Sequence, residues 1–97
     1  MGKLSDEAVA AGLLAAKRLH GGELPREAEL TSAPFITGWL LSGELDGFTR
    51  LGGFVSGHPV LPDGWCWTSV VLIIDPDLRW ARTVSRLYRL GEPFRSD

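Results

Sequence analysis

The stretch that decides the fold is WCWTSVVLII, residues 65–74. β-Branched and aromatic residues dominate it, a composition typical of a strand. Alternate side chains of a strand point to opposite faces. One face consists of Trp65, Trp67, Ser69, Val71 and Ile73, and the other of Cys66, Thr68, Val70, Leu72 and Ile74. Because both faces are largely apolar, the sequence predicts a strand that is covered on both sides.

The residues before this strand predict a hairpin. Two turn signals, Gly57-His58-Pro59 and Pro62-Asp63-Gly64, indicate that the chain reverses between them. Residues 49–56 hold Leu51, Phe54 and Val55 between glycines. This pattern predicts a second strand with a bulge or a close approach of the backbone.

Two helices are predicted further upstream. The first covers residues 6–20, because Ser5 is a favourable N-cap and Gly21-Gly22 ends the pattern. Residues 25–30 allow one or two further helical turns. The second helix follows the possible N-cap Thr31-Ser32 and ends at Gly43. Its apolar stripe at helical spacing consists of Phe35, Ile36, Trp39 and Leu40.

Residues 76–90 allow two interpretations, after a turn predicted at Asp75-Pro76-Asp77. As a helix, the segment separates apolar side chains from a stripe of arginines. That stripe consists of Arg79, Arg82, Arg86 and Arg89. As a strand the segment alternates poorly, so periodicity alone favours the helix.

The composition predicts one folded domain, residues 1–97. Hydrophobic residues make up 44% of the chain and charged residues 23%, as in ordinary packed domains. The single cysteine, Cys66, excludes an internal disulfide and favours the cytoplasm. The longest apolar run, residues 70–74, is too short for a membrane span, and no secretory signal is expected. A net charge of −2 argues against extensive phosphate neutralisation.

No catalytic, cofactor-binding or metal-binding residues are predicted. His58 and Cys66 are the only conceivable base and nucleophile, but Cys66 lies between two tryptophans in an apolar strand, which raises a thiol pKa. His58 is interpreted as a turn residue that binds its own loop. The histidines, the cysteine and the acidic residues show no metal-ligand spacing. We therefore expect a protein that is not an enzyme.

A series of short motifs lies between Leu51 and Gly91. They are Gly57-His58-Pro59, Asp63-Gly64, Thr68-Ser69, Trp80-Ala81-Arg82-Thr83, Ser85-Arg86 and Tyr88-Arg89-Leu90-Gly91. In this pattern the chain resembles small uncharacterised bacterial and phage-borne proteins that contain a domain of unknown function. The resemblance implies that the Thr-Ser block and the block from Thr83 to Tyr88 form adjacent antiparallel strands. It implies no activity.

Taken together, these features predict an α+β fold. Two N-terminal helices pack on one face of a small antiparallel β-meander formed by residues 49–90; the alternative is that residues 76–90 form a helix. Two short helices cover only one face of a sheet. We therefore expect the face with Trp65, Trp67, Val71 and Ile73 to meet a second copy of the chain or another protein.

The function predicted first is a non-enzymatic, small protein-binding module. Its partner-binding residues are Trp65, Trp67, Arg82 and Arg86. Small, acidic, cofactor-free chains from phages or mobile elements include inhibitors of host defence such as anti-CRISPR proteins, and by analogy this chain could be one. The alternatives are a nucleic-acid-associated regulator that uses the C-terminal arginine stripe and, third, a small hydrolase that uses His58. The arginines could instead pair internally with Glu27, Glu29, Glu44 and Asp46.

Overall fold

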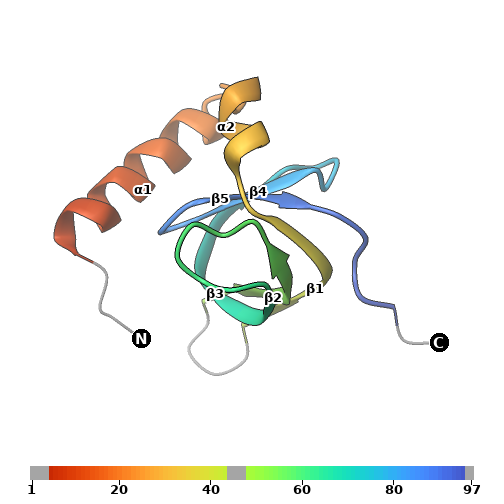
Figure 1. The fold of residues 1–97 in the computed structure, drawn as a ribbon. Helices are drawn as coiled ribbons and strands as arrows, with labels where there is room; N and C mark the ends of the chain where they lie inside the picture. Colours follow the sequence, from red (N-terminus) through yellow and green to blue (C-terminus); the bar gives the residue numbers. More distant parts are fainter. Residues whose placement is uncertain (1–4, 44–47, 96–97) are drawn as a thin grey trace.

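A closed five-stranded barrel with two helices outside it forms the fold (Figure 1). The computed structural model describes residues 5–43 and 48–95. The elements are α1 (Asp6–His20), α2 (Glu27–Ser32), β1 (Phe35–Ser42), β2 (Arg50–Ser56), β3 (Gly64–Ile74), β4 (Trp80–Thr83) and β5 (Leu87–Leu90). The predicted α+β fold, with two helices on an open meander, is therefore wrong. The alternative of a helix over residues 76–90 is also wrong, because this segment forms β4, a turn and β5.

The barrel closes through its first and last strands. Consecutive strands from β1 to β5 pair antiparallel. In such a series of five, the first and fifth strands run in the same direction, and β1 indeed pairs parallel with β5 at Phe35–Arg89 and Ile36–Leu90. Closure removes the two free edges that an open meander would expose.

Strand β1 replaces the predicted second helix, and a bulge explains the difference. Gly38 has a φ of 57°, and the pairing with β2 shifts between Thr37 and Leu40. The extra residue reverses the alternation of side chains. Ile36 and Trp39, three residues apart, are consequently both buried. An apolar spacing of three is the signature of a helix, so a bulged strand produced a helical pattern in the sequence.

Helix α1 confirms the first predicted helix. The Ser5 hydroxyl accepts a hydrogen bond from the Ala8 amide at 3.1 Å, and Gly21 caps the other end. The predicted turns over residues 25–30 occur two residues later, as α2. Helix α1 contacts β3 and β4, and α2 contacts β5 (Figure 1). Neither of these helices has the length and apolar character needed to cross a membrane; this holds for the described residues.

Two apolar clusters hold the fold together. The first lies among the barrel strands and consists of Ile36, Trp39, Leu51, Val55, Ala81, Tyr88 and Leu90. The second consists of Ala33, Trp80 and Leu87, with Leu19, Leu30 and Ile73 packed against them. Because Leu19 belongs to α1 and Leu30 to α2, the second cluster joins the helices to the barrel.

Hydroxyl groups fasten the turn between β4 and β5. Thr83 is fully buried. Its hydroxyl group donates a hydrogen bond to the Arg86 carbonyl at 3.1 Å and accepts one from the Arg86 amide at 3.3 Å. Ser85 Oγ lies 2.9 Å from Ser69 Oγ on β3, which also accepts from the Ser85 amide. The Thr-x-Ser-Arg and Thr-Ser motifs therefore have a structural role. The block from Thr83 to Tyr88 spans two strands and not one; its β4 part pairs antiparallel with β3.

Replacing Thr83 by valine is expected to lower the free energy of unfolding by about 1–3 kcal/mol. Valine has the same shape but leaves the Arg86 amide and carbonyl without the hydroxyl partner. Urea denaturation measures the loss. The control is Thr37→Val on β1. Thr37 is partly buried, and no hydrogen bond joins its hydroxyl group to residues 5–43 or 48–95. A loss at Thr83 no larger than at Thr37 would refute the role of the hydroxyl group.

Candidate functional site

Three aromatic side chains form an exposed cluster on the β2–β3 hairpin. We call Phe54, Trp65 and Trp67 the aromatic patch. The ring centroids of Phe54 and Trp65 lie 5.4 Å apart and those of Trp65 and Trp67 5.9 Å apart, both in edge-to-face geometry. The exposed fractions are 59%, 46% and 45%, respectively. Large aromatic rings are thus held in place while about half of each remains open to solvent.

The pairing of β2 with β3 positions the aromatic patch. Phe54 lies opposite Trp65, and Gly52 lies opposite Trp67. A Cβ at Gly52 would come within 2.7 Å of the Trp67 ring, so glycine is needed for the ring to lie against the strand. The sequence predicted a bulge or a close approach of the backbone here, and it predicted Trp65 and Trp67 as partner-binding residues. It missed Phe54 as a site residue, because only the register shows that Phe54 faces Trp65.

The predicted partner face of β3 divides into two parts. Trp65 and Trp67 are exposed. Val71 packs against the first apolar cluster, among the barrel strands, and Ile73 packs against the second cluster, which joins the helices to the barrel. Between Trp67 and Val70 the pairing of β3 with β2 shifts by one residue, which reverses the alternation of side chains along β3. The pairing with β4 shifts again between Val71 and Ile73. The expectation of one continuous surface with all four side chains is therefore corrected, because Val71 and Ile73 are partly buried against other residues of the chain.

The four C-terminal arginines do not form the predicted stripe. Arg79 Nε donates to Asp75 at 2.8 Å. Arg89 lies over the Phe35 ring and donates to the Ala33 carbonyl. Arg86 lies in the β4–β5 turn, and Arg82 points into a cavity. Arg82 lies on β4 and Arg89 on β5, whereas Arg79 precedes β4 and Arg86 lies in the turn, so the four side chains are directed to different surroundings.

The predicted internal pairing of the arginines differs from what the structure shows. Glu29 interacts electrostatically with Arg82 but forms its ion pair with Arg26. Glu27 forms no ion pair with a described residue. Two of the proposed partners, Glu44 and Asp46, lie outside the described residues.

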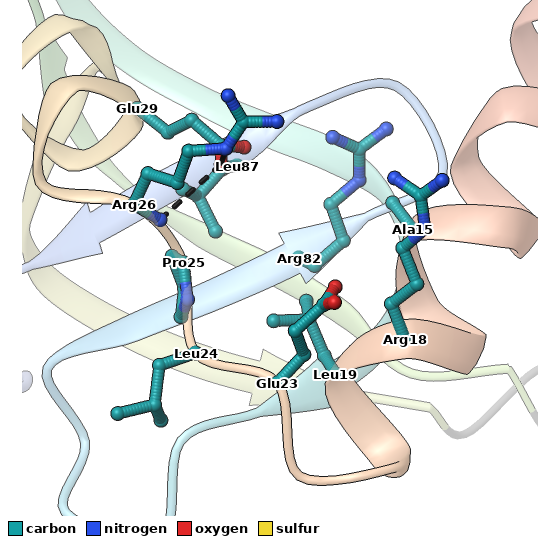
Figure 2. Close-up of a pocket in the computed structure, with 10 residues that line it drawn as sticks. All are labelled: Ala15, Arg18, Leu19, Glu23, Leu24, Pro25, Arg26, Glu29, Arg82 and Leu87. Carbon is teal, nitrogen blue, oxygen red and sulfur yellow. Dashed lines mark hydrogen bonds and ion pairs between the residues drawn. The ribbon is translucent and has the colours of Figure 1, made fainter.

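A cavity of about 470 Å³ lies between the helices and the β4–β5 hairpin (Figure 2). We call it the arginine cavity. Its charged side chains are Arg18, Glu23, Arg26, Glu29 and Arg82. Part of its apolar wall is formed by Leu19, Leu24 and Leu87. Of these residues only Arg82 was predicted from the sequence as a site residue. The others come from α1, α2, their connection and β5, which only the fold brings together.

Arg82 carries a half-buried charge in this cavity. Its Nε is buried and has no hydrogen-bond partner among the described residues, while one terminal nitrogen lies 3.5 Å from the Val84 carbonyl. Burial lowers the pKa of the Arg82 guanidinium, and the positive charge of Arg86 lowers it further. The negative charge of Glu29 raises this pKa by less, so the net change is a decrease. Within residues 5–43 and 48–95, the side chain is therefore held by packing and not by a carboxylate in contact with it.

The structure shows the surroundings of His58 and Cys66, the only conceivable base and nucleophile. His58 Nδ1 accepts hydrogen bonds from the Val60 and Leu61 amides, both at 3.0 Å, which confirms its role in the turn. In the neutral ring the proton is then on Nε2, and the basic lone pair is occupied. Burial lowers the His58 pKa, with a further decrease from Arg86. Burial raises the pKa of the Cys66 thiol.

Metal coordination would require a cluster of ligands. Within residues 5–43 and 48–95, no group of three His, Cys, Asp or Glu side chains is placed to hold an ion.

Comparison with known proteins identifies a family but no function. No curated protein and no solved structure matches the chain. A family model described as a family of unknown function matches residues 6–96, which include every described element. The chain belongs to this family of unknown function, DUF6634.

Proposed function

We propose that this chain is a small protein-binding module and that the aromatic patch is its binding surface. The observation that carries the proposal is the arrangement of Phe54, Trp65 and Trp67. The Trp65 ring is in edge-to-face contact with both Phe54 and Trp67, and all three rings remain about half exposed on a paired hairpin. The partner is another protein or a second copy of the chain.

Exposed tryptophans of this kind are well suited to binding. Aromatic residues dominate the energetics of protein interfaces because they bury a large area in one contact. Here the rings already contact one another, and Trp67 lies on Gly52. Little side-chain freedom is left to lose on binding, which reduces the entropic cost of association.

The remaining chemistry of the chain supports binding over catalysis. The occupied lone pair of His58 and the raised pKa of Cys66 provide neither a free base nor an activated nucleophile. The nucleic-acid alternative depended on a stripe of arginines, and these side chains lie in different surroundings. We therefore place the partner surface at Trp65 and Trp67, without Arg82 and Arg86.

Site-specific photo-crosslinking tests this proposal. A photoreactive phenylalanine analogue replaces Trp65 in cells that express the chain naturally. The matched control carries the same analogue at Val60, which is 76% exposed on the loop of the same hairpin. We expect one discrete crosslinked protein, or a crosslinked dimer, from position 65 and not from position 60. With the purified partner, Trp67→Ala should weaken binding about thirtyfold or more, as for an interface hot spot.

Two results together would contradict the proposal. One is identical crosslinking from positions 60 and 65. The other is light scattering that shows a monomer at every concentration tested. Circular dichroism of each variant establishes that the fold is retained.

A further inference from the structure

Among the described residues, two arginines of the arginine cavity have no carboxylate in direct contact, although Glu29 acts on Arg82 at longer range. Arg26 pairs with Glu29 at 3.5 Å. Arg18 and Arg82 form no ion pair within 4 Å with any described residue, and neither does Glu23. In Figure 2 the side chains of Arg18 and Arg82 extend in the same direction from α1 and β4. The cavity thus presents two guanidinium groups with unused hydrogen-bond donors.

The partly buried position of the Arg82 guanidinium raises the free energy of the folded protein when no anion is bound to it. A guanidinium that is withdrawn from water loses hydration and regains it only through hydrogen bonds or an opposite charge. The buried Nε of Arg82 has no acceptor among the described residues, and the contact with Val84 is long. An oxyanion at the terminal nitrogens would offset this cost. Guanidinium groups bind carboxylate and phosphate through parallel hydrogen bonds.

We propose that the arginine cavity binds a small organic anion. Its carboxylate or phosphate group lies between the guanidinium groups of Arg18 and Arg82. Its apolar body contacts Leu19, Leu24 and Leu87. This site is independent of the aromatic patch.

The size and charge of the cavity define the class of ligand. Its volume of about 470 Å³ lies within the roughly 300–1,000 Å³ of small-molecule sites. The apolar wall favours a ligand with a carbon skeleton over a bare inorganic ion. Three arginines and two glutamates leave the lining only weakly positive. The charge of one anionic group therefore balances the charge of the lining, whereas Glu23 and Glu29 would repel a polyanion.

Nuclear magnetic resonance titration of the full chain tests the proposal. The probes are phenyl phosphate and benzoate, with inorganic phosphate and acetate as matched anions that lack an apolar body. The Arg82 Nε–H signal and the Leu87 methyl signals report on the two ends of the site. We expect saturable shifts of both with phenyl phosphate, benzoate or both, and binding at least tenfold tighter than that of the corresponding small anion. Phenyl phosphate alone would indicate a phosphate ligand, and benzoate alone a carboxylate ligand.

Amino-acid substitutions test whether Arg18 and Arg82 bind the anion. Arg82→Gln and Arg18→Gln should each weaken binding at least tenfold. Because Arg18 is exposed on α1, Arg18→Gln tests the site even if Arg82→Gln does not fold. The control is Arg95→Gln, an exposed arginine paired with Glu92, which should bind like the unmodified chain. Absence of saturable shifts, unchanged affinity in Arg18→Gln, or equal affinity for the small anions would each overturn the proposal.

Discussion

Replacing Gly12 by alanine is expected to lower the free energy of unfolding by about 2–3 kcal/mol. Alanine is the better helix former by about 1 kcal/mol, so helix propensity predicts the opposite sign. The reason is the packing of α1 on the β4–β5 turn. A Cβ at Gly12 would overlap the carbonyl oxygen of Val84, a backbone atom that cannot rotate away. The helix must move off the barrel, with a cost typical of overpacking.

Chemical denaturation measures this effect, and the rest of α1 supplies the control. Ala10 lies on an exposed side of the same helix, where Ala10→Leu should change the free energy of unfolding by less than about 0.5 kcal/mol. A gain of stability in Gly12→Ala would show that α1 is not seated on Val84. Since Arg18 and Leu19 also belong to α1, Gly12→Ala should in addition weaken anion binding in the arginine cavity.

Replacing Asp75 by asparagine is expected to cost about 2 kcal/mol at pH 7 and much less in acid. The buried Asp75 carboxylate organises the β3–β4 turn. It accepts from the amides of Asp77 and Arg79 at 3.3 and 3.1 Å and from Arg79 Nε at 2.8 Å. Asparagine keeps the shape but loses the charge that strengthens these bonds.

The pH dependence follows from the pKa of Asp75. Burial raises this pKa, but the hydrogen bonds from the Arg79 side chain and from the Asp77 and Arg79 amides outweigh burial, so the folded pKa is lowered. The stabilisation is therefore complete above the unfolded pKa of about 3.9. It is lost as the pH falls through the folded pKa.

Urea denaturation of both proteins between pH 7 and pH 2 tests this dependence. The difference between the unmodified chain and Asp75→Asn should shrink below about pH 4. Asp77, whose side chain is 77% exposed and 3.7 Å from Arg79, is the matched control. Asp77→Asn should stay within about 0.5 kcal/mol of the unmodified chain at each pH. A difference for Asp75→Asn that persists at pH 2 would contradict the role of its charge.

Elements whose capping residues and residue pattern lie within one short segment were predicted correctly from the sequence. Helix α1 has its N-cap at Ser5 and its end at Gly21 within the segment itself. Strand β3 is long and rich in β-branched residues, and the loop before it is organised by His58. These signals act between residues close in sequence, so no tertiary information is needed to interpret them.

The predictions from the sequence were wrong where paired strands, and not a helix, produced the spacing of apolar residues. The bulge at Gly38 placed Ile36 and Trp39 on one side of β1 and imitated a helix. Residues 76–90 have apolar spacing that suits a helix because a turn over residues 84–86 separates two four-residue strands. In both cases the pairing of strands overrides the periodicity.

The sequence by itself thus determined α1, the β2–β3 hairpin and the two tryptophans that lie on it. Only the tertiary structure decided that the strands close into a barrel, since this depends on β1 meeting β5 more than fifty residues away. It also decided which side chains share a site. Phe54 joins the tryptophans through strand register, and Arg82 joins Arg18 through the packing of α1. Such contacts depend on how elements distant in the sequence pack, which residue spacing does not encode.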